Sequence, residues 1–487
     1  MRNLKYGLTA NGALAFTTTG DKNLDLFSVK GAMRNNEEKF VSIFKDAFRE
    51  DPILAMCNLL HLRDIKKGLG ERQLFREGLK VLPKEAVEAI MEAVSIIGRW
   101  DDILDSHDIP AVVYFVKKQL REDISRITGD TGISLLGKWM PSINASNRET
   151  VKLGKIWANK LGLTHKDYRK MLSALRAKIR IVENNLREKD YSFDYNSVPV
   201  RARMKYRQAF MRNDSERYTE FVDSLNIDDT KSELAHPHEI VKMYEGSLYG
   251  RDEVNLTLAE KMWEGQKVSS DNGNTIVVRD GSGSMCWGYS TVAPIDVATS
   301  LAILFSEHLT GPFKDTFITF SSRPQLVKFQ EGMTLGDKLR SIKSFTDMSN
   351  TDIEAVYELI YTQSLLNGQL SPENQISRIV IISDMEFDSG AVQSKGEMTT
   401  VSDNFRDKFE MAGLKFPEII YWNVSSDRVN IPVSNIDNVR LVSGFSSSVI
   451  NSIINNDSLD AKDMMFKTLA PYIELINADV INRASSR

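Results

Sequence analysis

The sequence has little cysteine and no long apolar run, and each absence excludes a class of protein. Two cysteines, Cys57 and Cys286, in 487 residues are too few for a disulfide framework and are typical of a reducing compartment. No stretch approaches the roughly eighteen apolar residues of a membrane span, and the first residues lack the apolar core of a secretory signal. We therefore expect a cytoplasmic protein without a membrane segment.

Charge is unevenly distributed, although the net charge is only −4. Residues 1–250 carry 41 Lys and Arg against 35 Asp and Glu, whereas the remainder holds 21 against 31. Within the first part, residues 151–217 have 17 basic and 7 acidic side chains. An excess of ten positive charges inside an otherwise acidic protein favours a polyanionic partner for that segment.

The first half of the chain has the pattern of an α-helical array. Residues 1–35 are polar and glycine-rich, so we expect an extended or loosely ordered lead-in there. Apolar residues recur at helical spacing from Glu37 onward, and Asp51-Pro52 ends one helix and begins the next. Further helices are predicted over residues 71–81, 85–98, 111–121 and 151–161. This pattern predicts a HEAT-like array of stacked helix pairs over residues 1–251, without a strict sequence period.

From residue 252 to residue 487, short strands alternate with helices. Strands are predicted from Thr275 to Arg279 and over residues 316–320, 378–383, 418–423 and 439–442, and helices over residues 295–308, 352–366, 403–412, 447–454 and 461–475. Parallel βαβ units form a doubly wound α/β sheet, in which ligands lie beyond the carboxyl ends of the strands. We expect an α/β domain over residues 252–487.

The apolar run that begins at Thr275 leads into a loop rich in oxygen ligands. The loop reads Asp-Gly-Ser-Gly-Ser from Asp280 to Ser284, and its glycines let the backbone turn tightly. The side chains of Asp280, Ser282 and Ser284 suit Mg²⁺ or Mn²⁺ rather than zinc. A nucleophile elbow needs Gly-x-Ser-x-Gly and a P-loop needs Gly-Lys-Ser/Thr, so neither fits. The alternative to a metal site is a plain turn.

The spacing Asp-x-Ser-x-Ser after a strand resembles the metal-ion-dependent adhesion site of the von Willebrand factor A family. The resemblance implies that Ser282 and Ser284 bind the ion directly and that a threonine and an aspartate from two later loops complete its shell. Thr351, before a predicted helix, and Asp384, after the apolar run 379–382, follow in the expected order. The resemblance also implies that both aspartates act mainly through metal-bound water, and that one position stays open for a partner's carboxylate.

Five further segments carry a second resemblance: Arg63–Arg72, Gly98–Ile103, Lys138–Ser142, Val198–Met204 and His236–Val241. They look like an uncharacterised family of phages and plants that joins a helical region to an A-like domain. That architecture is similar to the Ro autoantigen group, whose TROVE module is a ring of helical repeats that binds small noncoding and misfolded RNAs. The resemblance implies an RNA-binding scaffold, a ribonucleoprotein component, whose Mg²⁺-loaded A-like domain holds a protein partner.

A predicted helical face gives the RNA hypothesis particular residues. Along one helix from Lys166 to Glu188, four arginines would project within about 20° of one direction and pair with successive phosphates over about 27 Å. These are Arg169, Arg176, Arg180 and Arg187. Charge is added downstream by Arg201, Arg203, Lys205 and Arg207, with Tyr206 and Phe210 placed to stack on bases if exposed. The alternative is a solvated helix face.

Two other functions stay open at this point. In the first, the helical array and the metal site both recognise polypeptides, and the protein is an assembly module without a nucleic-acid role. In the second, the metal site belongs to a hydrolase, which we disfavour because Glu386 and Asp388 are the only candidate general bases. We expect a protein that is not an enzyme.

Overall fold

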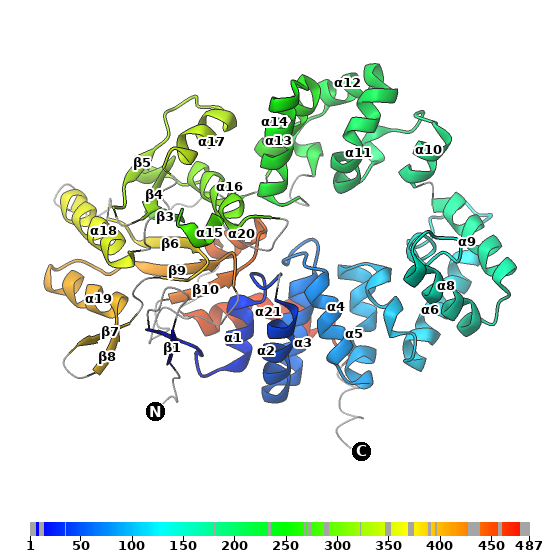
Figure 1. Cartoon of the computed structure of the whole chain (residues 1–487), viewed down its shortest axis with the longest axis horizontal. Helices are drawn as coiled ribbons and strands as arrows, with labels where there is room; N and C mark the ends of the chain where they lie inside the picture. Colours follow the sequence, from blue (N-terminus) through cyan, green and yellow to red (C-terminus); the bar gives the residue numbers. More distant parts are fainter. Residues whose placement is uncertain are drawn as a thin grey trace.

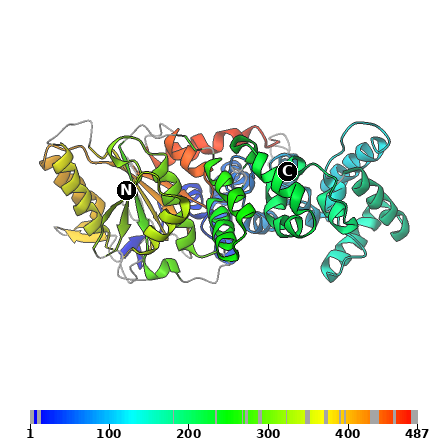
Figure 2. The same ribbon diagram turned by 90° about the horizontal axis from the view of Figure 1, so that it is seen from above.

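A long arc of helices and an α/β region make up the molecule, and both ends of the arc contact the α/β region (Figure 1). The computed structural model describes residues 6–8, 14–34, 36–179, 181–231, 235–266, 268–269, 274–286, 292–321, 323–345, 352–368, 375–387, 391–394, 397–426, 439–455 and 460–477. Seen from above, the two regions lie next to each other along the long axis (Figure 2). An N-terminal helical region joined to a C-terminal α/β region is confirmed.

The arc consists of α2 to α14. Their bounds are α2 (Glu37–Glu50), α3 (Pro52–Arg63), α4 (Gln73–Val81), α5 (Lys84–Ile97), α6 (Pro110–Ser125), α7 (Leu136–Trp139), α8 (Arg148–Leu161), α9 (His165–Ile179), α10 (Val182–Glu188), α11 (Val200–Asn213), α12 (Ser215–Ser224), α13 (Pro237–Gly250) and α14 (Glu253–Glu264). The helices predicted up to residue 161 are confirmed, with ends that differ by a few residues. Since α14 packs on α12 and α13, the array continues to Glu264.

Local chemistry explains why the predicted boundaries are nearly right. Asp51 ends α2 with an extended backbone, and its carboxylate accepts a hydrogen bond from the backbone N–H of Leu54 at 3.0 Å. Pro52 then occupies the first position of α3, where its missing N–H costs nothing. Asn147 caps α8 in the same way, through the N–H of Thr150. In the described part of the chain, no helix has the length and apolar character needed to cross a membrane.

The N-terminal segment is more ordered than its composition indicates. Two short strands, β1 (Tyr6–Leu8) and β2 (Leu14–Phe16), pair antiparallel, and α1 (Lys22–Val29) follows. Helix α1 is buried from Asn23 to Val29, against α2 on one side and the sheet on the other. The hydroxyls of Thr18 and Thr19 donate to the buried carboxylate of Asp25 at 2.6 and 2.7 Å. The expectation of a loosely ordered lead-in is therefore wrong for residues 14–34.

The α/β region is built on a six-stranded sheet in the order β10-β9-β6-β3-β4-β5. The strands are β3 (Thr275–Asp280), β4 (Thr316–Phe320), β5 (Leu326–Lys328), β6 (Arg378–Ser383), β9 (Glu418–Asn423) and β10 (Val439–Ser443). All neighbours are parallel except β4 and β5. The chain builds outward from β3 to β5 and then returns to add β6 on the other side of β3. The order of the strands therefore reverses between β3 and β6.

The remaining elements of this region cover the sheet or extend from it. They are α15 (Gly283–Cys286), α16 (Pro294–Glu307), α17 (Leu335–Lys343), α18 (Ile353–Gly368), α19 (Val401–Met411), α20 (Ser448–Ile454), α21 (Ala461–Ile473) and the hairpin of β7 (Ala391–Ser394) and β8 (Glu397–Thr400). Every strand and helix predicted for this region is confirmed in position, whereas β5, β7, β8, α15 and α17 were not predicted.

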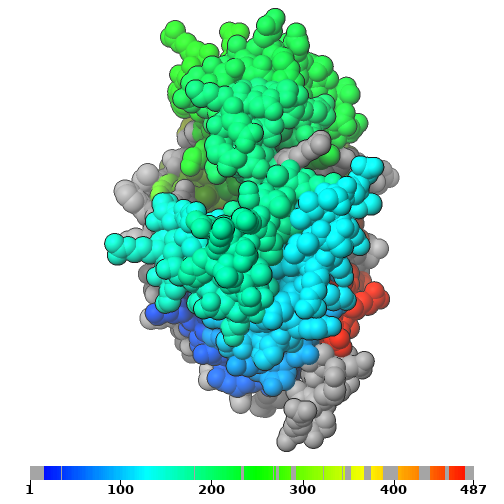
Figure 3. Space-filling model, turned by 90° about the vertical axis from the view of Figure 1, so that its right-hand side faces the viewer, coloured from blue at the N-terminus to red at the C-terminus, as the bar shows by residue number. Residues whose placement is uncertain are grey.

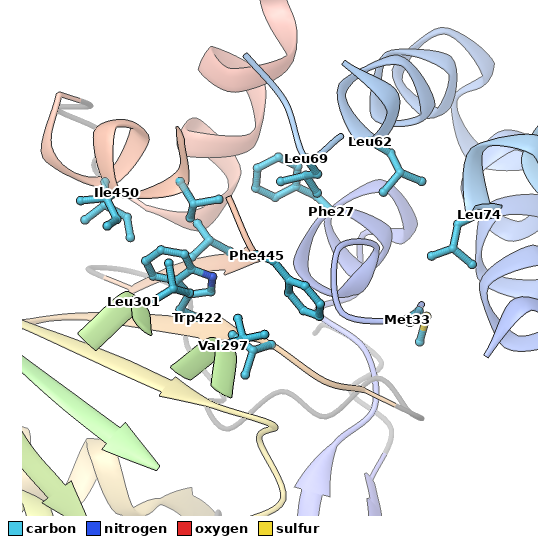
Figure 4. Packing of buried hydrophobic residues seen from close by; sticks show 14 of the residues in the cluster. Phe27, Met33, Leu62, Leu69, Leu74, Val297, Leu301, Trp422, Phe445 and Ile450 are labelled. Atoms are coloured by element: carbon cyan, nitrogen blue, oxygen red, sulfur yellow. The ribbon is translucent and has the colours of Figure 1, made fainter. Parts of the chain in front are cut away.

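One hydrophobic core runs across the junction between the arc and the α/β region. Side chains from both regions gather there, with Phe445 of the loop after β10 between the sheet and the first helices (Figure 4). The backbones also touch: Gly31 N–H donates to the hydroxyl of Ser443 at 3.0 Å, and a Cβ on Gly31 would lie 2.7 Å from Gly444. The hydroxyl of Tyr472 in α21 donates to Asp64 at 2.9 Å. At the other end of the arc, α13 packs on α16.

Candidate functional site

The reversal of strand order places two predicted ligands next to each other. Asp280 is the last residue of β3, and Asp384 comes directly after β6. The two strands are parallel neighbours, with Arg279 opposite Ile382 in the register. Ligands of doubly wound sheets lie at this switch point, beyond the carboxyl ends of the strands. The chain thus brings residues more than a hundred positions apart to one end of the sheet.

Hydrogen bonds connect these residues into one cluster. The carboxylate of Asp280 accepts from the backbone N–H of Ser282 at 2.9 Å and from the hydroxyl of Ser383 at 2.5 Å. The hydroxyls of Ser282 and Ser284 are 3.1 Å apart. Ser284 also bonds to the carboxylate of Asp384. Four of the five predicted metal ligands therefore come together, and the fifth, Thr351, lies outside the described residues.

The cluster carries negative charge in a buried place. Asp280 is fully buried, and burial raises the pKa of its carboxyl although Ser383 and Ser282 donate to it. Burial and the charge of Asp280 raise the pKa of Asp384 to about 7. Glu386, which is also buried, contributes in the same direction. Two adjacent buried carboxylates are costly unless a proton or a cation neutralises them.

The donor set fits a hard divalent cation. Carboxylate and hydroxyl oxygens are the protein ligands that Mg²⁺ and Mn²⁺ prefer, and the cluster contains no nitrogen or sulfur donor among its predicted members. Among the described residues, no group of three or more His, Cys, Asp and Glu side chains is arranged to hold a metal. The cluster offers two carboxylates and two serine hydroxyls, which is fewer charged ligands than such a group would supply.

Sequence reasoning overlooked two residues that shape this cluster. Ser383 ends β6 and donates to Asp280, and its position beside the predicted Asp384 was the available signal. Arg279 is buried in an otherwise apolar strand, donates to the hydroxyl of Thr299 at 3.0 Å, and has a pKa that burial lowers to about 10. A Cβ on Gly281 would lie 2.9 Å from its guanidinium. The glycine therefore lets the loop pass close over Arg279.

The predicted arginine stripe is not a continuous row. Helix α9 ends at Ile179 and α10 begins at Val182, with Ile181 extended between them, so the single helix expected over residues 166–188 is wrong. Arg180 lies outside the described residues. The guanidinium of Arg176 donates to the carbonyls of Gly137 and Met140 and to the hydroxyl of Ser142. Arg176 therefore holds α7 and the residues after it, which removes most of its donors from an external partner.

Three predicted arginines still face one hollow of about 980 Å³ between α9 and α10, which we call the α9–α10 hollow. Arg169 and Arg187 are exposed, and Arg176 is half-buried. The hollow is also lined by serine and asparagine side chains and by the acidic residues Glu188, Asp190 and Asp194. Figure 3 shows the outer side of the arc, with the helices from α6 to α10 in front.

The downstream basic residues divide into exposed and buried ones. Arg203 is 1% exposed and lies over the ring of Phe221 at 5.0 Å, so the prediction that it contacts RNA is wrong. Phe210 is fully buried, so the exposure that stacking on bases would require is not met. Arg207 is half-buried and donates to the carbonyl of Met204. Lys205 is exposed above Tyr206, and Arg201 is exposed with Glu239 at 3.4 Å. Position on α11, not charge alone, decides which of them solvent reaches.

Comparison with known proteins gives relatives without an assigned activity. Residues 274–474 match a family described as a domain of unknown function, DUF7788, and residues 110–279 match another, DUF2828. The chain is 28% identical to the uncharacterized protein L728 of Acanthamoeba polyphaga mimivirus, over 99% of this chain and 90% of that protein. The crystal structure of the RO (RSR) protein of Deinococcus radiodurans is similar over 90% of this chain and 92% of that chain, at 14% identity and a TM-score of 0.39.

Proposed function

We propose that the protein is a non-enzymatic scaffold that holds Mg²⁺, or another divalent cation such as Mn²⁺, at the end of the sheet and binds RNA in the α9–α10 hollow. The α/β region would be a von Willebrand factor A-like domain and the arc a HEAT-like, TROVE-like module. The cation, held by Asp280, Ser282, Ser284, Thr351 and Asp384, would supply a positive charge that binds an acidic residue of a protein partner.

The cation half of the proposal is supported by one observation above all. Asp280 lies at the end of β3 and Asp384 directly after β6, yet the charge of Asp280 raises the pKa of the Asp384 carboxyl, and Ser284 connects Ser282 to Asp384 by hydrogen bonds. Buried like charges of this kind are stable when a cation lies between them. The hydroxyls of Ser282 and Ser284 supply neutral ligands, which suits a site that keeps a position for an external carboxylate.

The RNA half is supported by the basic character of residues 151–217 and by the two exposed arginines in the hollow. Arg169 donates through Nε to the carbonyl of His165 at 3.3 Å, and Arg187 forms an ion pair with the exposed Glu188 at 2.8 Å. Arg176 instead donates to two carbonyls and a hydroxyl of another segment. Exposed ion pairs are weak, so Arg169 and Arg187 keep more donors for an external phosphate than Arg176 does. The segments that resemble the Ro group add to this support. The three acidic residues of the hollow favour the alternative, an assembly module that binds polypeptides.

The RNA half can be tested with the double variant Arg169→Glu and Arg187→Glu. We expect its affinity for a single-stranded oligoribonucleotide, measured by fluorescence anisotropy, to fall at least about tenfold, and the salt dependence to flatten by roughly 1.4 in the logarithmic slope, because two phosphate contacts are lost. The matched control is Arg49→Glu with Arg340→Glu, whose side chains are 73% and 68% exposed and each form an ion pair with a carboxylate three residues away.

Unchanged affinity and slope in the Arg169 and Arg187 variant would exclude the hollow as an RNA site. An equal loss in the control variant would show that overall charge, and not this surface, determines binding. If the wild-type protein binds no RNA, the assembly-module alternative is favoured.

A further inference from the structure

A second pocket lies where both ends of the arc meet the α/β region, and none of the functions above uses it. Its volume is about 510 Å³, and it is lined from six separate parts of the chain. These are the segment after α1, the loop between α3 and α4, the segment after α5, the starts of α11 and α13, and the loop after β10. We call it the junction pocket and define it by Arg34, Arg63, Arg72, Arg99, Arg201 and Ser446.

The junction pocket is strongly basic. Five arginines line it, whereas Glu71 and Glu239 are its only carboxylates among the described residues that form the wall. Glu71 is engaged by Arg34 at 2.5 Å, and Glu239 by Arg201 at 3.4 Å. These two pairs leave three further guanidinium groups on the wall. Arg63 is 1% exposed and donates through Nε to Asp102 at 2.7 Å, so it is part of the fold.

Among the five arginines of this wall, Arg72 and Arg99 have the weakest contacts with other side chains that the structure describes. The nearest carboxylate oxygen to Arg72 is that of Asp101, at 3.9 Å, and nearly half of the Arg72 side chain is exposed. Arg99 forms no ion pair with any side chain that the structure describes, and its guanidinium lies 4.9 Å from the ring centre of Trp139. Each guanidinium has five N–H donors, so both can bind an external acceptor.

The charges around Arg99 indicate which kind of ligand the junction pocket would bind. Burial lowers the pKa of Arg99, the neighbouring charge of Arg63 lowers it further, and that of Arg72 does the same, against the opposing effect of Asp101 and Asp102. Like charges therefore crowd around this part of the wall. His236, which begins α13 and also lines the pocket, adds no charge, because burial holds its pKa well below the ordinary value. An anion would relieve the repulsion.

The pocket is too large for a bare phosphate ion, and part of its wall is apolar. Ile65, Leu69, Pro199 and Val200 line it together with the arginines. A volume of about 510 Å³ lies within the range of sites for small organic ligands, roughly 300–1,000 Å³. Planar guanidinium groups bind phosphate oxygens with two parallel hydrogen bonds, and an apolar wall suits a base or a sugar.

We propose that the junction pocket binds a nucleotide, whose phosphate is held by Arg72 and Arg99 and whose base or sugar packs against the exposed Ile65 and Pro199. The nucleotide is either free or the 5′-terminal residue of an RNA chain, since both present the same phosphate. The inference does not depend on the α9–α10 hollow, which is lined by other residues.

The test is isothermal titration calorimetry of the full chain with adenosine 5′-monophosphate, adenosine, and a ten-residue RNA with or without a 5′-phosphate. We expect the monophosphate or the 5′-phosphorylated RNA to bind saturably and the unphosphorylated counterpart not to bind. Binding of the monophosphate identifies a free nucleotide, and binding of the phosphorylated RNA alone identifies a chain end. The double variant Arg72→Gln and Arg99→Gln should weaken binding at least about tenfold.

Two further variants make the result decisive. The double variant Arg49→Gln and Arg340→Gln removes the same charge elsewhere and should bind within about twofold of wild type. Ile65→Trp keeps the charge but fills the pocket from a side chain that is 40% exposed, so it should weaken binding as strongly even if the arginine variant does not fold. The proposal is overturned if no phosphate probe binds, if adenosine binds as well as its monophosphate, or if Ile65→Trp binds like wild type.

Discussion

The arc and the α/β region place their charged side chains in different ways. In the α/β region, the carboxylates of Asp280 and Asp384 gather at one end of the sheet with hydroxyls between them. In the arc, buried arginines serve the fold: Arg63 pairs with Asp102, and Arg203 lies over the ring of Phe221. The first region gathers like charges in one buried place, whereas these arginines of the second pair with a carboxylate or pack on an aromatic ring.

The difference follows from what fixes a side chain in each architecture. Parallel strands all end at the same edge of a sheet. The position of a motif that directly follows such a strand can therefore be predicted. Charged residues at helical spacing form one exposed row only if the helix is continuous and no other element packs on that face. The extended backbone at Ile181 and the contacts of Arg176 with α7 break both conditions. A charge pattern on helices is therefore weaker support for a binding site than one at strand ends.

The largest expected effect tests whether Arg203 serves the fold. Changing Arg203 to Glu should lower the free energy of unfolding by roughly 3–5 kcal/mol, because it leaves a carboxylate buried against Phe221 without a cation. Lys205, two positions along the same helix and exposed, is the control, and Lys205→Glu should change stability by no more than about 0.5 kcal/mol. Denaturant unfolding followed by circular dichroism measures both. Similar stability of the two variants would refute the structural role of Arg203.

The second prediction concerns the carboxylates at the end of the sheet. Mg²⁺ at a hundred times its dissociation constant should raise the free energy of unfolding of the wild-type protein by about 2.7 kcal/mol and that of Asp280→Asn by nothing measurable. Without the cation, Asp280→Asn should not be less stable than wild type, because it removes one of two neighbouring buried charges. Thermal unfolding with and without Mg²⁺ checks both expectations.

The control for the cation is Asp105→Asn, which changes an exposed carboxylate of the arc and should keep the full response to Mg²⁺. Stabilisation of Asp280→Asn by Mg²⁺ would show that the ion binds elsewhere. That result would also contradict the proposed difference between the two regions, because the carboxylates at the end of the sheet would then not bind the cation.

A smaller effect tests the junction that the two regions share. His238 packs its ring against Phe445 at 5.5 Å, and burial lowers its pKa from 6.5 to about 3. Below pH 6.5 the His238 imidazole is protonated in the unfolded chain but stays neutral in the folded chain. The free energy of unfolding therefore falls as the pH falls. Between pH 7 and pH 5 this histidine should contribute about 2 kcal/mol to the loss, and His238→Phe should remove that contribution.

The matched control is His165→Phe, since His165 is exposed at the start of α9 and should leave the pH dependence unchanged. The measurement is thermal or denaturant unfolding at pH 7 and pH 5. An identical loss of stability in His238→Phe and wild type would show that His238 titrates normally and that the junction is open to solvent.

Much of the secondary structure was predictable because its signals are local. Asp51-Pro52 marks a helix boundary through a side-chain cap and a fixed backbone angle, and the β-branched run from Thr275 marks a strand. Helix α1 was missed because its polar residues look like those of a loop. Its buried Asp25 is stabilised by Thr18 and Thr19, and its position depends on β10, more than four hundred residues away. No local pattern contains that contact.

The sequence by itself determined which oxygen-bearing side chains follow the ends of β3 and β6, because a strand's direction and a glycine-rich turn are properties of a few consecutive residues. Only the tertiary structure decided that β6 lies beside β3, that Arg203 is inside while Lys205 is outside, and that six distant segments surround the junction pocket. These outcomes depend on which surfaces of different elements bury each other. That choice is made by the apolar area and the hydrogen bonds of the whole chain, and no single segment encodes it.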